Sequence, residues 1–344
     1  MLSEISENNH LLPRWDLSDF YDGFSDPKLV KDMKNLEQDV ATFSQKQGQL
    51  ASTLVSFYDD LLTYEGICKR LSKLSSYAYL SFATQMTDEK AKGFEQKISE
   101  FQTSLWTQLI FFTHEIIALS PDELEHAYTL NEQLKTYKPW LDSTRVYKDY
   151  ILDIKQEQIL AQKDLTSGSA WVRLYDQTLA EMVFTDKEGK KLNLAQLLER
   201  MSESDAPTRR EAAELLSMEL ASKKSLFTLI FNTLLKDKDI HDNLRNYKTP
   251  WASRHLANMI EEDVVNALVE TVKANYHLCH RYYAWKAKQF GVDKIDYWDR
   301  NAPLPASHDP QTSWKKAKKI VYDAYNDFSP KMAEISKKFF DNAW

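Results

Sequence analysis

The feature of this sequence that most constrains its fold is a long stretch in which apolar residues recur at steps of three and four. Seven positions carry the pattern: Phe94, Ile98, Phe101, Leu105, Leu109, Phe112 and Ile116. This spacing puts all seven on one face of a helix, so it predicts a long amphipathic helix with that face buried. His114 and Glu115 fall on the opposite side at about 100° per residue, and we expect both to face solvent.

Two further stripes of the same kind precede this helix, at residues 29–43 and 54–78. A polar turn around Gly48 separates them. Asp26 followed by Pro27 is typical of a helix start, because a capping side chain and a proline both suit the first turn.

Capping signals also mark the ends of the long helix. Thr87 or Asp88 is expected to cap its start. The next helix begins with a capping box and a proline, formed by Ser120, Pro121 and Glu123, so the long helix ends just before them.

The fold class predicted is mainly α, with long antiparallel helices and a small β-hairpin or edge sheet near residues 169–194. Seven glycines and ten prolines in 344 residues are too few for many tight turns. The segment 169–194 is rich in Trp, Val, Tyr and Phe and has a turn near Gly189. We place a domain boundary here, between a helical amino-terminal domain (1–165) and a second domain (166–344).

Helical patterns return beyond the predicted hairpin. They run over residues 194–201 and restart at Asp205 and Pro207. The apolar run at 226–235 is shorter than the roughly 20 residues that span a bilayer, and it is predicted to be a buried core helix.

Regular patterns continue to the end of the sequence. The longest, at residues 265–283, is closed by Gly291. A fresh helix start at Ser329 and Pro330 then divides two final helical stretches.

Net charge and amino-acid composition argue against several kinds of partner and cellular location. The formal net charge is -7 and no basic block is present, so a nucleic-acid partner is not expected. Cys68 and Cys279 are the two cysteines, which argues against a disulfide framework and fits a reducing compartment. Neither a secretory signal nor a membrane span is visible, and the expected location is the cytoplasm.

No catalytic constellation can be assembled from motifs. His114 and Glu115 would begin an H-E-x-x-H zinc motif, but position 118 is Ala118 instead of the second histidine. His277 and Cys279 lie about 200° apart on a helix and cannot share a metal with His280. Cys279 lies on an apolar stripe and is predicted to be a small core residue.

Two irregular segments are the candidate cleft walls, because aromatic and polar residues on irregular backbone often build clefts. The candidate residues are Trp251, Arg254, His255, Tyr297, Asp299 and Arg300. The prolines around the second segment predict extended backbone there. The alternative interpretation is structural: an Asp–Arg pair and two tryptophans brace a loop between helices.

Five segments resemble the amino-terminal portion of oligoendopeptidase F-like enzymes, zinc metallopeptidases related to thimet oligopeptidase. They read LPRWDLSDFYDGFSDPKL, SGSAWVRLYDQTLAEMVF, NYKTPWASRHLANMIEEDVVNALVETV, HRYYAWKAKQFGVDKIDYWDRNAPLP and FSPKMAEISKKFFDNAW. The resemblance implies one lobe of a clam-like helical enzyme that admits short peptides to a channel and cleaves them at one zinc ion.

The resemblance also implies where the chemistry lies. In that family the H-E-x-x-H helix and a glutamate ligand lie downstream of the last resembling segment. We therefore carry over no catalytic or metal-binding residue, and we expect this chain alone to bind no zinc and to be inactive.

Three functions follow as hypotheses. The first is an amino-terminal part of a zinc-dependent oligoendopeptidase, with short peptides and a separate carboxy-terminal half of the enzyme as partners. The alternative is a non-catalytic helical peptide-binding or interaction module. A third is a self-sufficient metalloprotein that uses His255, His277 and His280.

Overall fold

A computed structural model describes residues 15–305 and 312–343. The chain divides into two compact units: Met33–Pro305, and the described residues of Met1–Asp32 together with Ala306–Trp344. Helix α2 (Pro27–Ser44) begins in the second of these units and continues into the first. Its start at Pro27 confirms the predicted helix start, and Asp26 accepts a hydrogen bond of 2.7 Å from the backbone N–H of Lys28.

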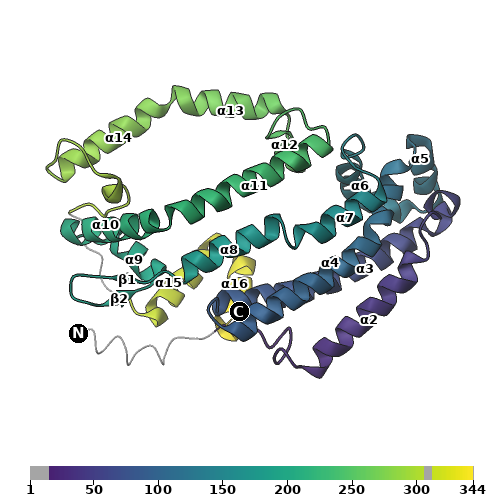
Figure 1. Cartoon of the computed structure of the whole chain (residues 1–344), viewed down its shortest axis with the longest axis horizontal. Helices are drawn as coiled ribbons and strands as arrows, with labels where there is room; N and C mark the ends of the chain where they lie inside the picture. Colours follow the sequence, from purple (N-terminus) through teal and green to yellow (C-terminus); the bar gives the residue numbers. More distant parts are fainter. Residues whose placement is uncertain (1–14, 306–311, 344) are drawn as a thin grey trace. The chain divides into compact units, whose positions relative to one another are not determined.

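The larger unit contains two long helices that pack against each other, α3 (Phe57–Thr84) and α4 (Glu89–Ala118) (Figure 1). Asp88 caps α4 by accepting a hydrogen bond of 2.9 Å from the backbone N–H of Ala91, as predicted. Two short 3-10 turns, η1 (Leu50–Ser52) and η2 (Leu54–Ser56), precede α3. The turn between α2 and η1 contains Gly48 with a positive φ of 82°, as its residue type suggests.

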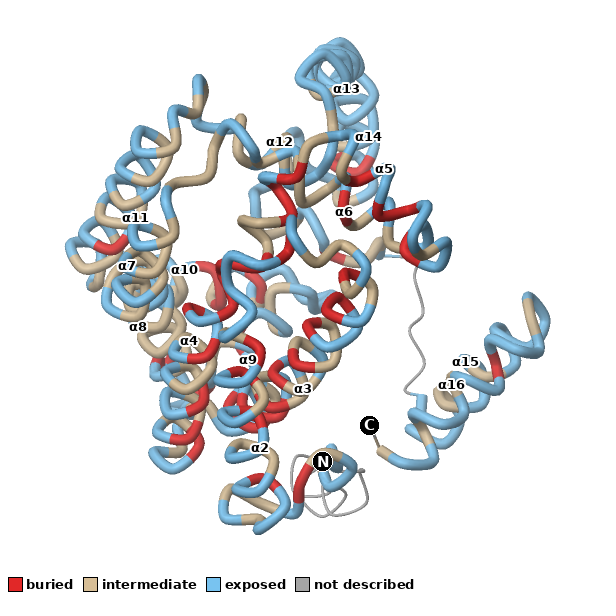
Figure 2. The backbone as a smooth tube through the Cα atoms, turned by 90° about the vertical axis from the view of Figure 1, so that its right-hand side faces the viewer, coloured by how far each residue is buried: buried red, intermediate tan, exposed pale blue. Residues whose placement is uncertain are grey.

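The best-packed core lies along α3 and α4, where Figure 2 shows many buried residues. Phe112 is central to it, with its ring 5.2 Å from Phe43 and 5.0 Å from Tyr64. The predicted stripe on α4 is buried except at Phe101, which is half-buried. Since α4 also packs against α6 and α7, a second side of it is buried as well.

Short helices follow α4, and the last of them, α7, packs along it. They are α5 (Pro121–Leu130), η3 (Glu132–Tyr137), α6 (Lys138–Arg145) and α7 (Ile154–Asp164). The predicted capping box of Ser120 and Glu123 is present at the start of α5. Arg145 donates hydrogen bonds to the carbonyls of Ile116 and Leu119, at 2.8 and 2.6 Å, and so satisfies the last turn of α4.

The predicted β-hairpin is present but small. Strand β1 (Phe184–Thr185) pairs antiparallel with β2 (Lys191–Leu192) around a turn in which Gly189 has a positive φ of 81°. The first part of the predicted region is instead helix α8 (Gly168–Ala180), because its aromatic residues follow a helical rather than an alternating spacing. The hairpin packs on α9 (Leu194–Arg200) and α10 (Ala206–Ser222).

Helix α11 (Lys224–Leu244) contradicts one prediction. The run at 226–235 was predicted to be a buried core helix, but only Ile230 is buried there. Its neighbours Leu229, Phe231 and Leu235 are exposed. One side of α11 packs on α8, and the exposed side chains lie away from the buried Ile230.

The longest apolar pattern is also divided and exposed. It forms α13 (Glu262–Ala274) and α14 (Tyr276–Gln289), which break at Asn275. Cys279 is exposed, so its prediction as a core residue was wrong. The spacing of apolar residues over 265–283 predicts an apolar face, but it does not show whether another element packs on that face.

The remaining elements are α12 (Ala252–Ala257), η4 (Tyr297–Asp299), α15 (Trp314–Phe328) and α16 (Pro330–Asn342). Helices α15 and α16 pack on each other, with the rings of Trp314 and Phe340 6.0 Å apart. Their boundary confirms the helix start predicted at Ser329 and Pro330. No helix among the described residues is long and apolar enough to cross a membrane.

The boundary predicted at residue 165 falls in the short connection between α7 and α8. It stays a prediction.

Candidate functional site

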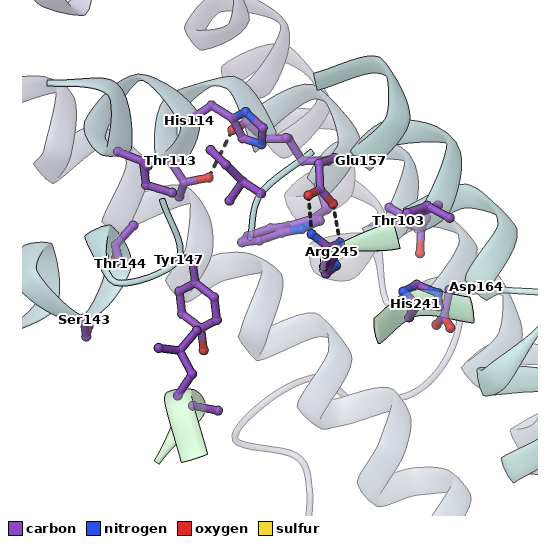
Figure 3. A pocket seen from close by; sticks show the side chains of 18 of the residues that line it. Thr103, Thr113, His114, Ser143, Thr144, Tyr147, Glu157, Asp164, His241 and Arg245 are labelled. Carbon is purple, nitrogen blue, oxygen red and sulfur yellow. Dashed lines mark hydrogen bonds and ion pairs between the residues drawn. The ribbon is translucent and has the colours of Figure 1, made fainter. Parts of the chain in front are cut away.

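The largest pocket described in the Met33–Pro305 unit is a groove of about 820 Å³ beside α4. One wall is a row of α4 side chains from Gln102 to Ile117, and α7 and the end of α11 supply the others. The last turn of α6, the loop after it, and the residues in and just after α12 complete the lining. Figure 3 shows polar side chains from all these helices except α12 around one space.

An ion pair between Glu157 and Arg245 lies at the middle of the groove (Figure 3). Arg245 Nη1 and Nη2 donate to the two carboxylate oxygens of Glu157 at 2.5 and 2.7 Å. Nη1 also donates to the carbonyl of Tyr150 at 3.2 Å, and the backbone N–H of Leu152 donates to Glu157 at 3.0 Å. The pair therefore ties the end of α11 to the first turn of α7 and the loop before it.

The geometry of this pair keeps both groups charged. Burial acts to raise the pKa of Glu157, but the hydrogen bonds from Arg245 and Leu152 and the charge of Arg245 outweigh it, and the pKa is lowered. The hydrogen bonds that Arg245 donates to Glu157, with the charge of Glu157, raise the pKa of Arg245. Because the two charges neutralise each other, the middle of the groove presents no net charge.

A stacked pair of aromatic rings supports the same junction. The rings of Tyr150 and Tyr247 lie 4.5 Å apart at an angle of 14°. Just before Tyr247, Arg245 is the residue that caps the end of α11 and Asn246 adopts a positive φ of 58°. The chain can then turn into α12, which brings Leu256 and Met259 to the groove.

His114 and Glu115 do not lie on a solvated face, so that prediction was wrong. His114 is half-buried and lines the groove, and burial lowers its pKa. Glu115 accepts hydrogen bonds from the backbone N–H groups of Gly48 and Leu50, at 2.6 and 3.0 Å. The physical reason is that α4 is covered on several sides, so the face opposite its main stripe meets other elements.

One end of the groove carries a carboxylate and an imidazole, Asp164 of α7 and His241 of α11. Figure 3 draws them on one side of the Glu157–Arg245 pair and Tyr147 on the other. Asp164 accepts a hydrogen bond of 2.5 Å from Ser169 Oγ. Within residues 15–305 and 312–343, no Lys or Arg forms an ion pair with Asp164.

The first predicted cleft segment lies beside this groove without lining it. Trp251 donates a hydrogen bond of 2.9 Å to Glu262 and is half exposed, Arg254 is exposed, and His255 is half-buried. The groove is lined instead by the residues that follow them, Leu256 among them.

The second predicted segment forms a separate structural cluster. Asp299 accepts from Arg209 Nε and Nη2 at 3.0 and 2.7 Å, so its arginine partner is Arg209 of α10, not the adjacent Arg300. The carbonyl of Arg300 accepts from buried Lys286 at 2.7 Å. Tyr297 contacts Ser217 of α10 at 3.2 Å between hydroxyl oxygens. The backbone is a 3-10 turn rather than the extended segment predicted.

A metal centre does not fit the residues that the structure describes. They include no group of three or more His, Cys, Asp or Glu side chains placed to hold an ion. In particular, His255, His277 and His280 are not brought together, which contradicts the third hypothesis.

Sequence analysis did not identify the groove residues Glu157, Asp164, His241 and Arg245. A signal existed for one of them: Asp153 and Gln156 form a capping box, which marks Glu157 as a first-turn acid. Its partner Arg245 is 88 positions away, and no local pattern shows that pairing.

Comparison with known proteins then identifies the two parts of the chain that meet at the groove. A family model described as Oligopeptidase F matches residues 115–184, and one described as Peptidase family M3 matches residues 200–327. The chain belongs to peptidase family M3. Glu157 lies in the first matched segment and Arg245 in the second, so the ion pair joins the two parts of this M3 chain.

Individual relatives agree with this family. Oligopeptidase PepF of Bacillus subtilis is 21% identical over 335 residues, which cover 96% of this chain and 50% of PepF. Group B oligopeptidase PepB of Streptococcus agalactiae is 21% identical over 336 residues, covering 96% of this chain and 55% of PepB. The chain thus spans about half the length of these curated relatives.

A solved structure shows the same fold. The oligoendopeptidase-F of Enterococcus faecium superimposes with a TM-score of 0.74 at 16% identity, over 90% of this chain and 64% of that one. This confirms the predicted fold class, mainly helical with a small antiparallel hairpin.

Proposed function

We propose that this chain is the amino-terminal part of a zinc-dependent oligoendopeptidase that hydrolyses short peptides. The observation that carries the proposal is the ordered match of both M3 segments, together with oligopeptidase relatives that align along 96% of the chain. Membership of family M3 supports a metal-dependent reaction. The cytoplasm remains the proposed location.

The zinc ligands are proposed to come from a segment other than the described residues. The 344-residue sequence has no H-E-x-x-H motif, and the described side chains do not fit a metal. The chain alone is therefore proposed to be inactive. Its partner would be a carboxy-terminal half of the same enzyme, supplied as a separate polypeptide.

The contribution of the present chain would be peptide binding and restriction of access. The groove beside α4 has the mixed apolar and polar lining of a ligand site. The six residues predicted from sequence, from Trp251 to Arg300, stay proposed as further walls of the peptide channel. The domain boundary near residue 165 is proposed as the point where the channel-forming part begins.

The alternative function is a non-catalytic helical peptide-binding or interaction module. The exposed apolar side chains of α11, α13 and α14 favour it, because surfaces of this kind often mark interaction sites. In this alternative the groove still binds peptides, but the protein hydrolyses none, even when it is joined to a carboxy-terminal half.

A chimera separates the two functions. The part of Bacillus subtilis PepF that matches this chain is replaced by the 344 residues, and hydrolysis of a quenched fluorescent peptide is measured with and without a chelator. Chelator-sensitive hydrolysis supports the peptidase. A folded chimera that binds zinc and does not hydrolyse the peptide favours the binding module, and a chimera with the motif glutamate changed to glutamine is the control.

A further inference from the structure

We propose that the groove beside α4 binds a short extended peptide whose free amino terminus lies at the end formed by Asp164 and His241. The inference rests on the proposed function for the class of ligand, a peptide. It adds the site, the direction in which the peptide lies and a preference for a positively charged end.

The length of the groove suits a short peptide. Its α4 wall runs from Gln102 to Ile117, which is roughly 20 Å of helix at about 1.5 Å per residue. An extended chain advances about 3.3 Å per residue, so the wall is about six peptide residues long. A single amino acid would leave most of this length unused.

The lining offers both kinds of contact that an extended peptide needs. Trp106, Ile110, Leu160 and Met259 supply apolar surface for side chains. The amide of Gln102 and the hydroxyl of Thr103 supply polar contacts at one part of the groove. The hydroxyls of Thr113, Ser143 and Thr144 already donate to carbonyls of their own helices, and their oxygens can still accept hydrogen bonds from peptide N–H groups. This mixture is typical of sites that bind molecules with alternating polar and apolar groups.

The charges set the direction. Glu157 is neutralised by Arg245, so it does not attract a cation. Asp164 has a hydroxyl partner, Ser169, and no ion pair within the described residues. At the other end, around Tyr147, the lining contains no carboxylate.

A second carboxylate strengthens the negative end. A methyl group at Gly168 would lie 3.2 Å from Asp164 Oδ1 and 3.1 Å from Asp237 Oδ2. The two carboxylates therefore flank one glycine. Asp237 does not line the groove, so its charge adds to the negative potential at this end, while Asp164 is the carboxylate that can contact an ammonium group directly.

The inference is tested by binding, with the full 344-residue chain and two probes. One probe is an apolar heptapeptide with a free amino terminus and a dye at its carboxyl end, and the other is the same peptide acetylated at its amino terminus. Fluorescence anisotropy is expected to show about tenfold tighter binding of the free form, since one charge-assisted hydrogen bond is worth that factor.

Variants locate the effect. Asp164→Asn keeps the shape of the side chain and should remove most of the preference for the free peptide, while acetylated-peptide binding is unchanged; the additional change Asp237→Asn should remove the remainder. Trp106→Ala should weaken both probes. Asp293→Asn removes an exposed carboxylate outside the groove and should change neither.

Equal affinity of the two probes would overturn the inference, as would a folded Asp164→Asn chain that prefers the free form as strongly as the natural chain does. Absence of binding by the folded chain would also overturn it. The assay needs neither zinc nor hydrolysis, so an active PepF chimera combined with any of these results would refute this inference and leave the proposed peptidase standing.

Discussion

Glu157 and Arg245 show how single residues join distant parts of this chain. Their side chains are 14% and 21% exposed, so each would be left in a poorly solvated place without the other. Glu157→Gln keeps the shape but removes the charge, and we expect it to lower the free energy of unfolding by about 2 kcal/mol. Urea denaturation measures this directly.

The matched control for that variant is Glu214→Gln, which breaks an exposed pair with Arg210 within α10. It should cost less than about 0.5 kcal/mol. Equal losses in the two variants would show that the groove pair is no more than a surface contact.

The same pair predicts a pH dependence at acid pH. The pKa of Glu157 is lowered from its ordinary 4.5, so its stabilising effect is present above that pH and is lost as the pH falls through the lower folded value. Unfolding free energies of the natural chain should therefore fall faster below pH 4.5 than those of Glu157→Gln. Parallel curves for the two chains would contradict the assigned pairing.

His114 predicts a separate change at higher pH. Burial lowers its pKa from the ordinary 6.5, although the charge of Glu157 acts in the opposite direction. The unfolded chain therefore takes up a proton first, and stability should decline as the pH falls below 6.5. His114→Gln should remove this decline, and NMR titration of the imidazole should give a value below 6.5; a value above 6.5 would contradict burial in the groove.

At the scale of elements, helix boundaries were predictable where their causes are local. Asp88, Ser120 and Asp205 each cap the helix that sequence reasoning assigned to them. The stripe on α4 also followed from its spacing. The exposure of the apolar residues on α11 and α14 could not be predicted from sequence. An apolar stripe shows which side of a helix is apolar, but it does not show whether another element packs against that side.

Two adjacent residues of α11 test whether this helix is exposed on one side. Ile230 is 2% exposed and Phe231 is 63% exposed. Ile230→Ala should lower the free energy of unfolding by about 3 kcal/mol through loss of buried surface and a cavity. Phe231→Ala should cost less than about 1 kcal/mol.

Thermal or urea unfolding of the two variants gives the answer. Similar large losses at both positions would mean that α11 is buried all round, as the sequence alone predicted.

At the scale of the whole molecule, the candidate site could be predicted only in part. The irregular segment at 246–260 was recognised, and residues within it do line the groove. The charged residues that define the groove were not recognised, because they come from α7 and α11 and meet only in the folded chain. The resemblance of sequence segments predicted the family, whereas the candidate groove was found only from the positions of its residues in the folded chain.

For the whole molecule, we propose that this chain contributes peptide binding to an M3 peptidase and relies on another segment for zinc. The most direct measurement is the zinc content of the purified 344-residue chain after saturation with zinc and exhaustive dialysis, by mass spectrometry of the metal. We expect far less than one zinc ion per chain. One retained ion per chain, with peptide hydrolysis that a chelator abolishes, would contradict the claim.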